Sequence, residues 1–141
     1  MLHELADAPG DRTPSELHER YLKALATAID DHGVGSVAEA SGVDPAKLRA
    51  ILDGDAPDVT LEEAASVLSV RDGSPDGETI AMVARDELLM GMTTAVLDVE
   101  AVESGIDGEL EAREIQSKIE GRFPMTLREF ALLHQYISGA R

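Results

Sequence analysis

The stretch from Ser36 to Asp55 constrains the fold more than any other, because it has the features of two short helices joined by a tight turn. Gly42 stands where that turn needs a positive φ, which glycine adopts without steric cost. Asp44 and the proline after it suit the N-cap and the first residue of the second helix. Leu48 and Ile51 then share one face of this helix. The stretch therefore predicts a helix-turn-helix.

Helix-start signals recur along the whole chain. Thr-x-x-Glu capping boxes begin at Thr13, Thr60 and Thr126, and each precedes a run of apolar residues at helical spacing. A long helix is expected after the Pro- and Gly-containing residues 71–77, with Gly91 as its candidate point of interruption, and another over 109–120. No segment alternates apolar and polar residues for long, so we predict an all-α protein without a sheet.

These signals divide the chain into four parts. We assign residues 1–13 to a leader, 14–70 to an N-terminal helix-turn-helix unit, 71–77 to a linker and 78–141 to a divergent, C-terminal helix-turn-helix-like unit. The leader is expected to be mobile as far as Arg12, with docking through Leu2 and Leu5 as the alternative.

The two units resemble each other in sequence. Residues 38–44 match 101–107, residues 52–57 match 119–124, and residues 60–65 match 126–131, at offsets of 63, 67 and 66. The alternative is that any two capped helical hairpins look alike. We predict an internal pseudo-repeat in which Gly105 plays the part of Gly42. The units should pack together, because burying Leu88, Leu89 and the methionines needs a neighbour.

Composition points to a protein adapted to high salt. The chain has 28 acidic and 12 basic residues, a net charge of −16, and only three lysines. Since the Debye length falls to about 3 Å in 1 M salt, such self-repulsion would be screened there. The alternatives are an ordinary acidic cytosolic protein or a partner of basic proteins. The absence of cysteine excludes disulfides and thiolate chemistry. With no apolar run long enough to span a membrane, we expect a cytoplasmic location.

Residues 17–70 resemble the DNA-binding core of phage repressors of the Cro type. The resemblance implies that the helix after Gly42 lies in the major groove of DNA. It is carried by Val37, Ala38, Gly42, Val43, Leu48, Ile51, Gly54, Pro57 and Thr60-Leu61-Glu62-Glu63.

The whole chain also resembles a haloarchaeal family of unknown function. Residues 88–98 and 118–127 carry this second resemblance most clearly. It agrees with adaptation to high salt and implies no activity.

The function we predict is that of a DNA-binding regulator or nucleoid-associated protein adapted to high salt. Seven residues are candidates for contact with double-stranded DNA. Arg49 could bind guanine with two hydrogen bonds and Lys47 could reach a phosphate, while the second unit supplies more amide and guanidinium groups. The candidates are Lys47, Arg49, Arg113, Gln116, Ser117, Lys118 and Arg122. Against DNA binding, residues 16–55 contain eight acidic and four basic residues. The interleaved glutamates of the second unit favour a solvated helix surface as the alternative.

The alternative function is a non-catalytic protein-interaction module, with another protein or a second copy of the chain as its partner. Methionine suits adaptable binding surfaces, although each methionine could equally belong to the core. The candidates are Met82, Met90, Met92 and Met125. We do not expect an enzyme, a cofactor or a metal site, because the four histidines are scattered and match no catalytic motif.

Overall fold

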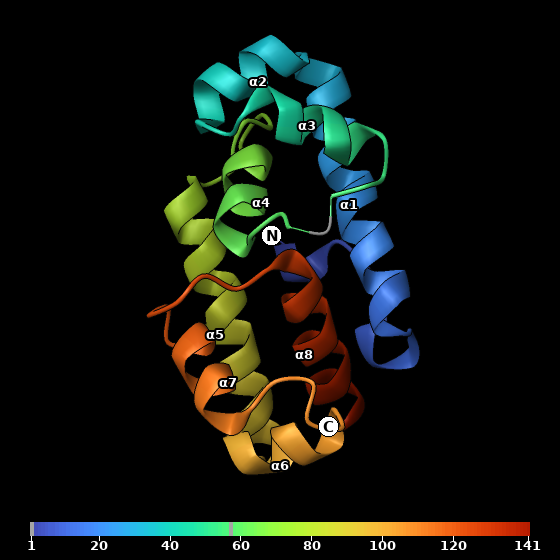
Figure 1. The fold of residues 1–141 in the computed structure, drawn as a ribbon, viewed down its shortest axis with the longest axis vertical. Helices are drawn as coiled ribbons and strands as arrows, with labels where there is room; N and C mark the ends of the chain where they lie inside the picture. Colours follow the sequence, from blue (N-terminus) through green and yellow to red (C-terminus); the bar gives the residue numbers. More distant parts are fainter. Residues whose placement is uncertain (1, 57) are drawn as a thin grey trace.

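The computed structural model describes residues 2–56 and 58–141, and over these residues it is all-helical, as predicted (Figure 1). Two 3₁₀ turns, Leu2–Glu4 and Pro9–Asp11, precede the α-helices. The helices are α1 (Pro14–His32), α2 (Val34–Ser41), α3 (Pro45–Leu52), α4 (Leu61–Leu68), α5 (Gly77–Ala95), α6 (Val99–Gly105), α7 (Ala112–Ile119) and α8 (Leu127–Gly139).

The three capping boxes form as the sequence predicts. The backbone N–H groups of Glu16, Glu63 and Glu129 donate to the hydroxyls of the threonines that precede α1, α4 and α8, at 3.0 to 3.1 Å. Each glutamate accepts a hydrogen bond from its threonine's backbone N–H in return. These local contacts fix where the three helices begin.

The first predicted turn also forms. Gly42 has φ of 75° and ends α2 in the left-handed conformation, which explains the glycine. Asp44 caps α3 by accepting a hydrogen bond from the backbone N–H of Ala46 at 2.8 Å. Helices α2 and α3 lie together at one end of the molecule and pack on α1 (Figure 1).

Helix α5 is continuous through Gly91, although the sequence pattern made this residue a candidate point of interruption. A Cβ atom at Gly91 would lie 2.6 Å from Cγ2 of Ile137. The glycine therefore serves the close approach of α8 to α5 and does not interrupt the helix.

The second predicted turn differs from the sequence prediction. Gly105 is the last residue of α6 and has no positive φ, which is found instead at Asp107 and Gly108. A Cβ atom at Gly105 would lie 2.0 Å from Cζ of Tyr136, so this glycine makes room for an aromatic ring of α8. Gly105 is thus not the counterpart of Gly42. Helix α7 begins at Ala112 and not at Glu109.

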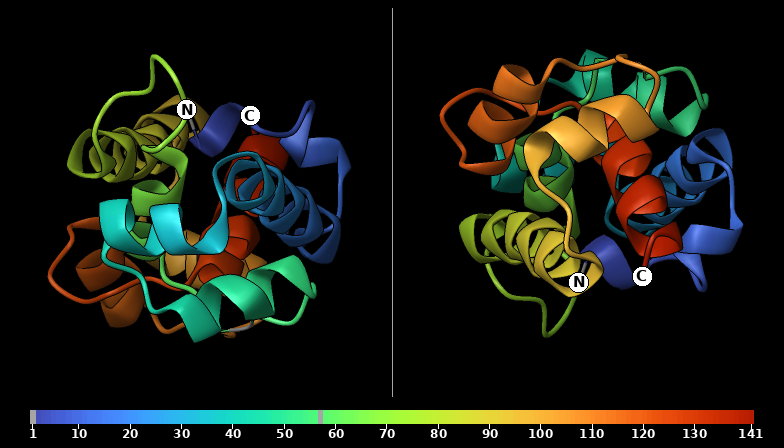
Figure 2. Two further views of the ribbon diagram at one scale, coloured as in Figure 1. Left: turned by 90° about the horizontal axis from the view of Figure 1, so that it is seen from above. Right: turned by 90° about the horizontal axis from the view of Figure 1, so that it is seen from below.

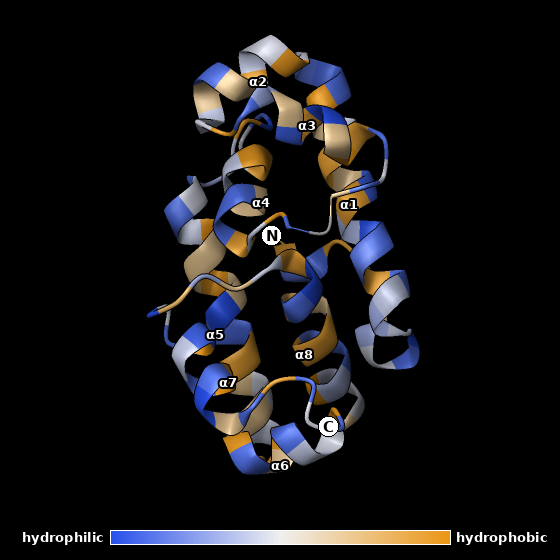
Figure 3. Cartoon of the chain, viewed as in Figure 1, coloured by the Kyte–Doolittle hydropathy of each residue, from blue (hydrophilic) through white to orange (hydrophobic). Residues whose placement is uncertain are grey.

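One hydrophobic core runs through both predicted units. Helices α1 and α8 pack side by side, and α5 packs on both α4 and α8 (Figure 2). Apolar residues concentrate on the sides of these helices that face one another (Figure 3). The leader docks on this core, since Leu2 is fully buried and Leu5 is partly buried against it. The leader is therefore docked on the core, which was the alternative to a mobile leader.

The starts of α4 and α8 meet across an antiparallel bridge between Thr60 and Thr126. The backbone N–H of Leu61 donates to Met125 at 2.7 Å, and that of Leu127 donates to Val59 at 2.8 Å. These pairs are equivalent at an offset of 66 residues, although the internal repeat itself stays a prediction. Pro57, which belongs to both the repeat and the repressor resemblance, lies outside the described residues.

Candidate functional site

The predicted DNA-reading residues of α3 are only partly available. Arg49 is exposed, but the Lys47 ammonium donates to both carboxylate oxygens of Glu63 at 3.0 Å. Since Glu63 also caps α4, Lys47 ties α3 to the start of the next helix. Asp44 and Asp58 line the surface hollow beside Lys47 and add negative charge there.

The predicted residues around α7 show the same pattern. Arg113 and Gln116 are exposed and Ser117 is half-buried. The Lys118 ammonium lies 2.6 Å from the capping glutamate Glu129, and Arg122 lies 2.6 Å from a carboxylate oxygen of Glu120. Figure 1 places α3 near one end of the long axis and α7 toward the other. The seven candidates therefore do not form one surface.

The exposed large apolar side chains concentrate on α5 instead. Met82 is 56% exposed, Met90 63% and Leu89 45%, and Val96, which ends the helix, is 89% exposed. Intervals of 7 and 8 residues place Met82, Leu89 and Met90 on one side of a helix with 3.6 residues per turn, and Val96 follows as the C-cap of α5. We call Met82, Leu89, Met90 and Val96 the apolar stripe.

The sequence anticipated this surface only in part. Met82 and Met90 were candidates for an interaction surface, but Met92 and Met125 are buried in the core. Leu89, which we expected to be buried, is half-exposed. Helical spacing alone does not tell which side of α5 faces α4 and α8.

Val96 carries the least favourable backbone of the stripe. Its φ of 57° and ψ of 51° lie in the left-handed region, which β-branched residues rarely adopt. Such a conformation costs on the order of 1–3 kcal/mol, and the fold compensates this cost elsewhere. An exposed valine in this conformation contributes little to the core, so the sequence keeps an apolar side chain there at a cost in stability.

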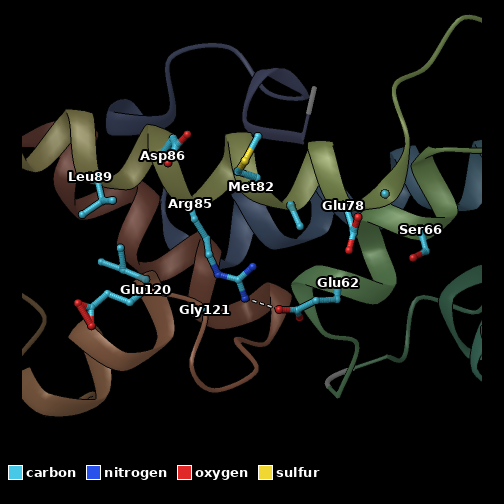
Figure 4. Close-up of a pocket in the computed structure, with 12 residues that line it drawn as sticks. Glu62, Ser66, Glu78, Met82, Arg85, Asp86, Leu89, Glu120 and Gly121 are labelled. Carbon is cyan, nitrogen blue, oxygen red and sulfur yellow. Dashed lines mark hydrogen bonds and ion pairs between the residues drawn. The ribbon is translucent and has the colours of Figure 1, made fainter.

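A groove beside the stripe brings α4, α5 and α7 together (Figure 4). Arg85 reaches from α5 across its floor and forms an ion pair with Glu62 of α4. The Arg85 Nε–H also donates to the backbone oxygen of Lys118 at 3.0 Å. With only 13% of its side chain exposed, Arg85 fixes the positions of the three helices that form the groove.

The rim of this groove is negatively charged. Carboxylates from all three helices line it, namely Glu62, Glu78, Asp86 and Glu120. Met82 and Leu89 of the stripe lie among them (Figure 4). We call this site the acidic groove. It offers apolar contact along α5 and carboxylates on either side.

The buried titratable side chains Tyr21 and His134 have a structural role. The Tyr21 hydroxyl and Nδ1 of His134 form a hydrogen bond of 2.8 Å between α1 and α8. Burial lowers the pKa of His134 to about 4 and raises the pKa of Tyr21, so both are neutral near pH 7. Among residues 2–56 and 58–141, no cluster of three or more His, Asp or Glu side chains could hold a metal ion.

Comparison with known proteins gives the family. Residues 17–140 match a family described as a family of unknown function (DUF5791). The chain belongs to this family. No curated protein and no solved structure matches it. Within the described part of the chain, the helices of this family member include none that combines the length and apolarity needed to cross a membrane.

Proposed function

We propose that this chain is a non-catalytic protein-interaction module that binds a partner through the apolar stripe of α5. The proposal rests on one observation: of the five exposed large apolar side chains among the described residues, three lie on α5 and a fourth, Val96, is the C-cap of this helix. Scattered apolar residues are normal on a protein surface, whereas a contiguous patch with a charged rim is typical of an interface. Exposed Met82 and Met90 add an adaptable contact surface.

Photo-crosslinking tests this proposal. A photoreactive residue at Met90 should give one defined protein adduct in the native cells, and the same residue at exposed Asp30 of α1 serves as the control. Leu89→Glu, which is tolerated at a half-exposed position, should remove the adduct without unfolding the chain. Equal adducts at Met90 and Asp30, or an adduct that survives Leu89→Glu, would count against a docking role.

DNA binding is the second candidate, and the turn between α2 and α3 favours it. Gly42 closes this turn, and Arg49 of α3 is exposed, as the Cro-type resemblance requires. Lys47 and Lys118 weaken it, because both are engaged with capping glutamates. In molar KCl, where phosphate contacts contribute little, base contacts would have to supply most of the affinity.

A mobility shift against genomic fragments in molar KCl tests DNA binding. Binding that is lost when Arg49→Ala and Arg113→Ala are combined would support it. Absence of a shift, or a shift unaffected by the two substitutions, would leave the interaction module as the remaining candidate. Both candidates are proposed for a cytoplasmic protein adapted to high salt, as the haloarchaeal resemblance and the net charge of −16 suggest.

A further inference from the structure

The chemistry of the acidic groove selects among partners for the apolar stripe. Glu78 and Asp86 line the groove and have no cation within ion-pair distance in the described residues. Glu62 forms an ion pair with Arg85, and Glu120 forms one with the exposed Arg122. The groove therefore has four carboxylates and one cation, Arg85, in its lining, with two carboxylates free to accept a partner's cations.

The shape of the site suits a helix. Met82 and Leu89 are seven residues apart on α5, which separates them by about 10 Å at 1.5 Å per residue. Val96, seven residues after Leu89, is the exposed C-cap of the same helix. An amphipathic partner helix presents its own apolar residues at the same interval when it lies along this axis. The carboxylates of α4, α5 and the C-terminal end of α7 lie beside this axis (Figure 4), where the polar flank of such a helix would meet them.

We propose, on the basis of the proposed interaction function, that the partner of this site is a basic amphipathic helix of another protein. Its apolar side chains contact Met82, Leu89 and Val96. Lysine or arginine side chains on its flank pair with Glu78 and Asp86. A second copy of the chain fits less well, because it would bring the same carboxylates to the same surface and each copy has a net charge of −16.

High salt makes direct contact necessary. Because the Debye length is only about 3 Å in 1 M salt, distant charges contribute little attraction. The selection for basic residues must then arise from ion pairs at contact distance, formed while the apolar stripe is covered. Affinity should fall only modestly with salt, unlike that of a protein steered to its partner by long-range charge.

A pair of synthetic peptides tests this chemistry on the full-length protein. Both are amphipathic helices of about 20 residues, which span about 30 Å, with leucine at the seven-residue interval. One has lysine along its flank and the other glutamate. Fluorescence anisotropy in molar KCl should show the lysine peptide binding at least about tenfold more tightly, a ratio that corresponds to about 1.4 kcal/mol.

Charge reversal on the protein supplies the matched control. Glu78→Lys combined with Asp86→Lys should remove the preference for lysine, while Asp30→Lys combined with Asp31→Lys on α1 should leave it unchanged. All four positions are exposed, so both double variants should fold. Equal binding of both peptides, or a preference that survives the groove reversal, would overturn the basic-helix proposal.

The outcomes distinguish failure of the basic-helix proposal from failure of the docking function. If the Met90 crosslink requires Leu89 but neither peptide is preferred, docking stands and the basic partner is wrong. If sedimentation in the same salt shows a dimer that Leu89→Glu dissociates, the occupant is a second copy and this inference fails. If crosslinking and peptide binding are both absent, the docking function itself fails.

Discussion

At the scale of single residues, pairing inside the fold decides which side chains remain available. Lys47 and Lys118 look free in sequence, yet each lies against the glutamate that caps the next helix. The capping boxes were predictable because they are local. The lysine contacts were not, because they depend on how the tertiary fold places α3 relative to the start of α4 and α7 relative to the start of α8. Exposure of Leu89 and Val96 was unpredictable for the same reason.

Burial of His134, which disfavours its charged form, makes the fold sensitive to mild acid. Because the folded pKa of about 4 lies below the unfolded value of 6.5, the unfolded chain binds the extra proton between them. This contribution to stability is complete above pH 6.5 and is lost as the pH falls toward 4, up to roughly 3 kcal/mol.

Urea unfolding at several pH values measures this effect. His134→Asn retains an acceptor for the Tyr21 hydroxyl but does not titrate, so its stability should change less than that of the wild type between pH 6.5 and 5. The exposed His32→Asn change is the control and should behave as the wild type does. Identical pH dependence in His134→Asn and the wild type would show that protonation of His134 does not cause the acid sensitivity.

Val96→Gly should stabilise the fold and weaken docking. Glycine relieves the left-handed conformation, which costs other residues about 1–2 kcal/mol, so the free energy of unfolding should rise by about 1 kcal/mol after allowing for the more flexible unfolded chain. Thr94→Gly, on the same helix, should instead lower it by about 0.3 kcal/mol, the difference between the helix propensities of threonine and glycine. Chemical denaturation measures both, and a destabilised Val96→Gly protein would contradict the account of strain.

At the scale of elements, sequence signals gave most helices but misassigned one glycine. The starts of α1, α3, α4 and α8 follow from caps within a few residues of each helix. Gly42 was correctly placed at a turn because a positive φ is a local requirement. Gly105 was misassigned because its role depends on the Tyr136 ring, which lies 31 positions later in the chain.

The two glycines should therefore respond differently to alanine. Gly105→Ala forces a Cβ atom against the Tyr136 ring and should destabilise the fold by about 1–3 kcal/mol, and Tyr136→Ala should relieve most of that added cost. Gly42→Ala meets no neighbouring atom, and its cost of about 1 kcal/mol should be independent of Tyr136. A double-mutant cycle by urea denaturation measures this, and a stabilised Gly105→Ala protein would contradict it.

At the scale of the whole molecule, charge and core act against each other. One hydrophobic core joins helices from both predicted units, while 28 acidic residues face only 12 basic ones. The acidic groove adds to this excess where α4, α5 and α7 meet. The architecture therefore holds like charges close together, and ions in the solvent must screen them.

Stability should rise with salt. Raising KCl from ~0.1 M to ~3 M shortens the Debye length from about 10 Å to below 3 Å and screens the carboxylates from one another. The midpoint of thermal unfolding, followed by circular dichroism, should increase over this range. Sucrose is excluded from protein surfaces but has no charge. A sucrose series at matched osmolality therefore measures the stabilisation that does not depend on screening. A midpoint that is flat or falls with KCl would contradict adaptation to high salt.

Methionine oxidation distinguishes a covered α5 surface from a free one, because the chain also contains buried methionines that serve as controls. In the purified protein, a brief pulse of oxidant should modify exposed Met82 and Met90 quickly and buried Met92 and Met125 slowly. In the native cells, where the proposed partner would cover the stripe, Met82 and Met90 should become as protected as the buried pair. Rapid oxidation of Met82 and Met90 in both settings would show that nothing covers the stripe and would contradict the account.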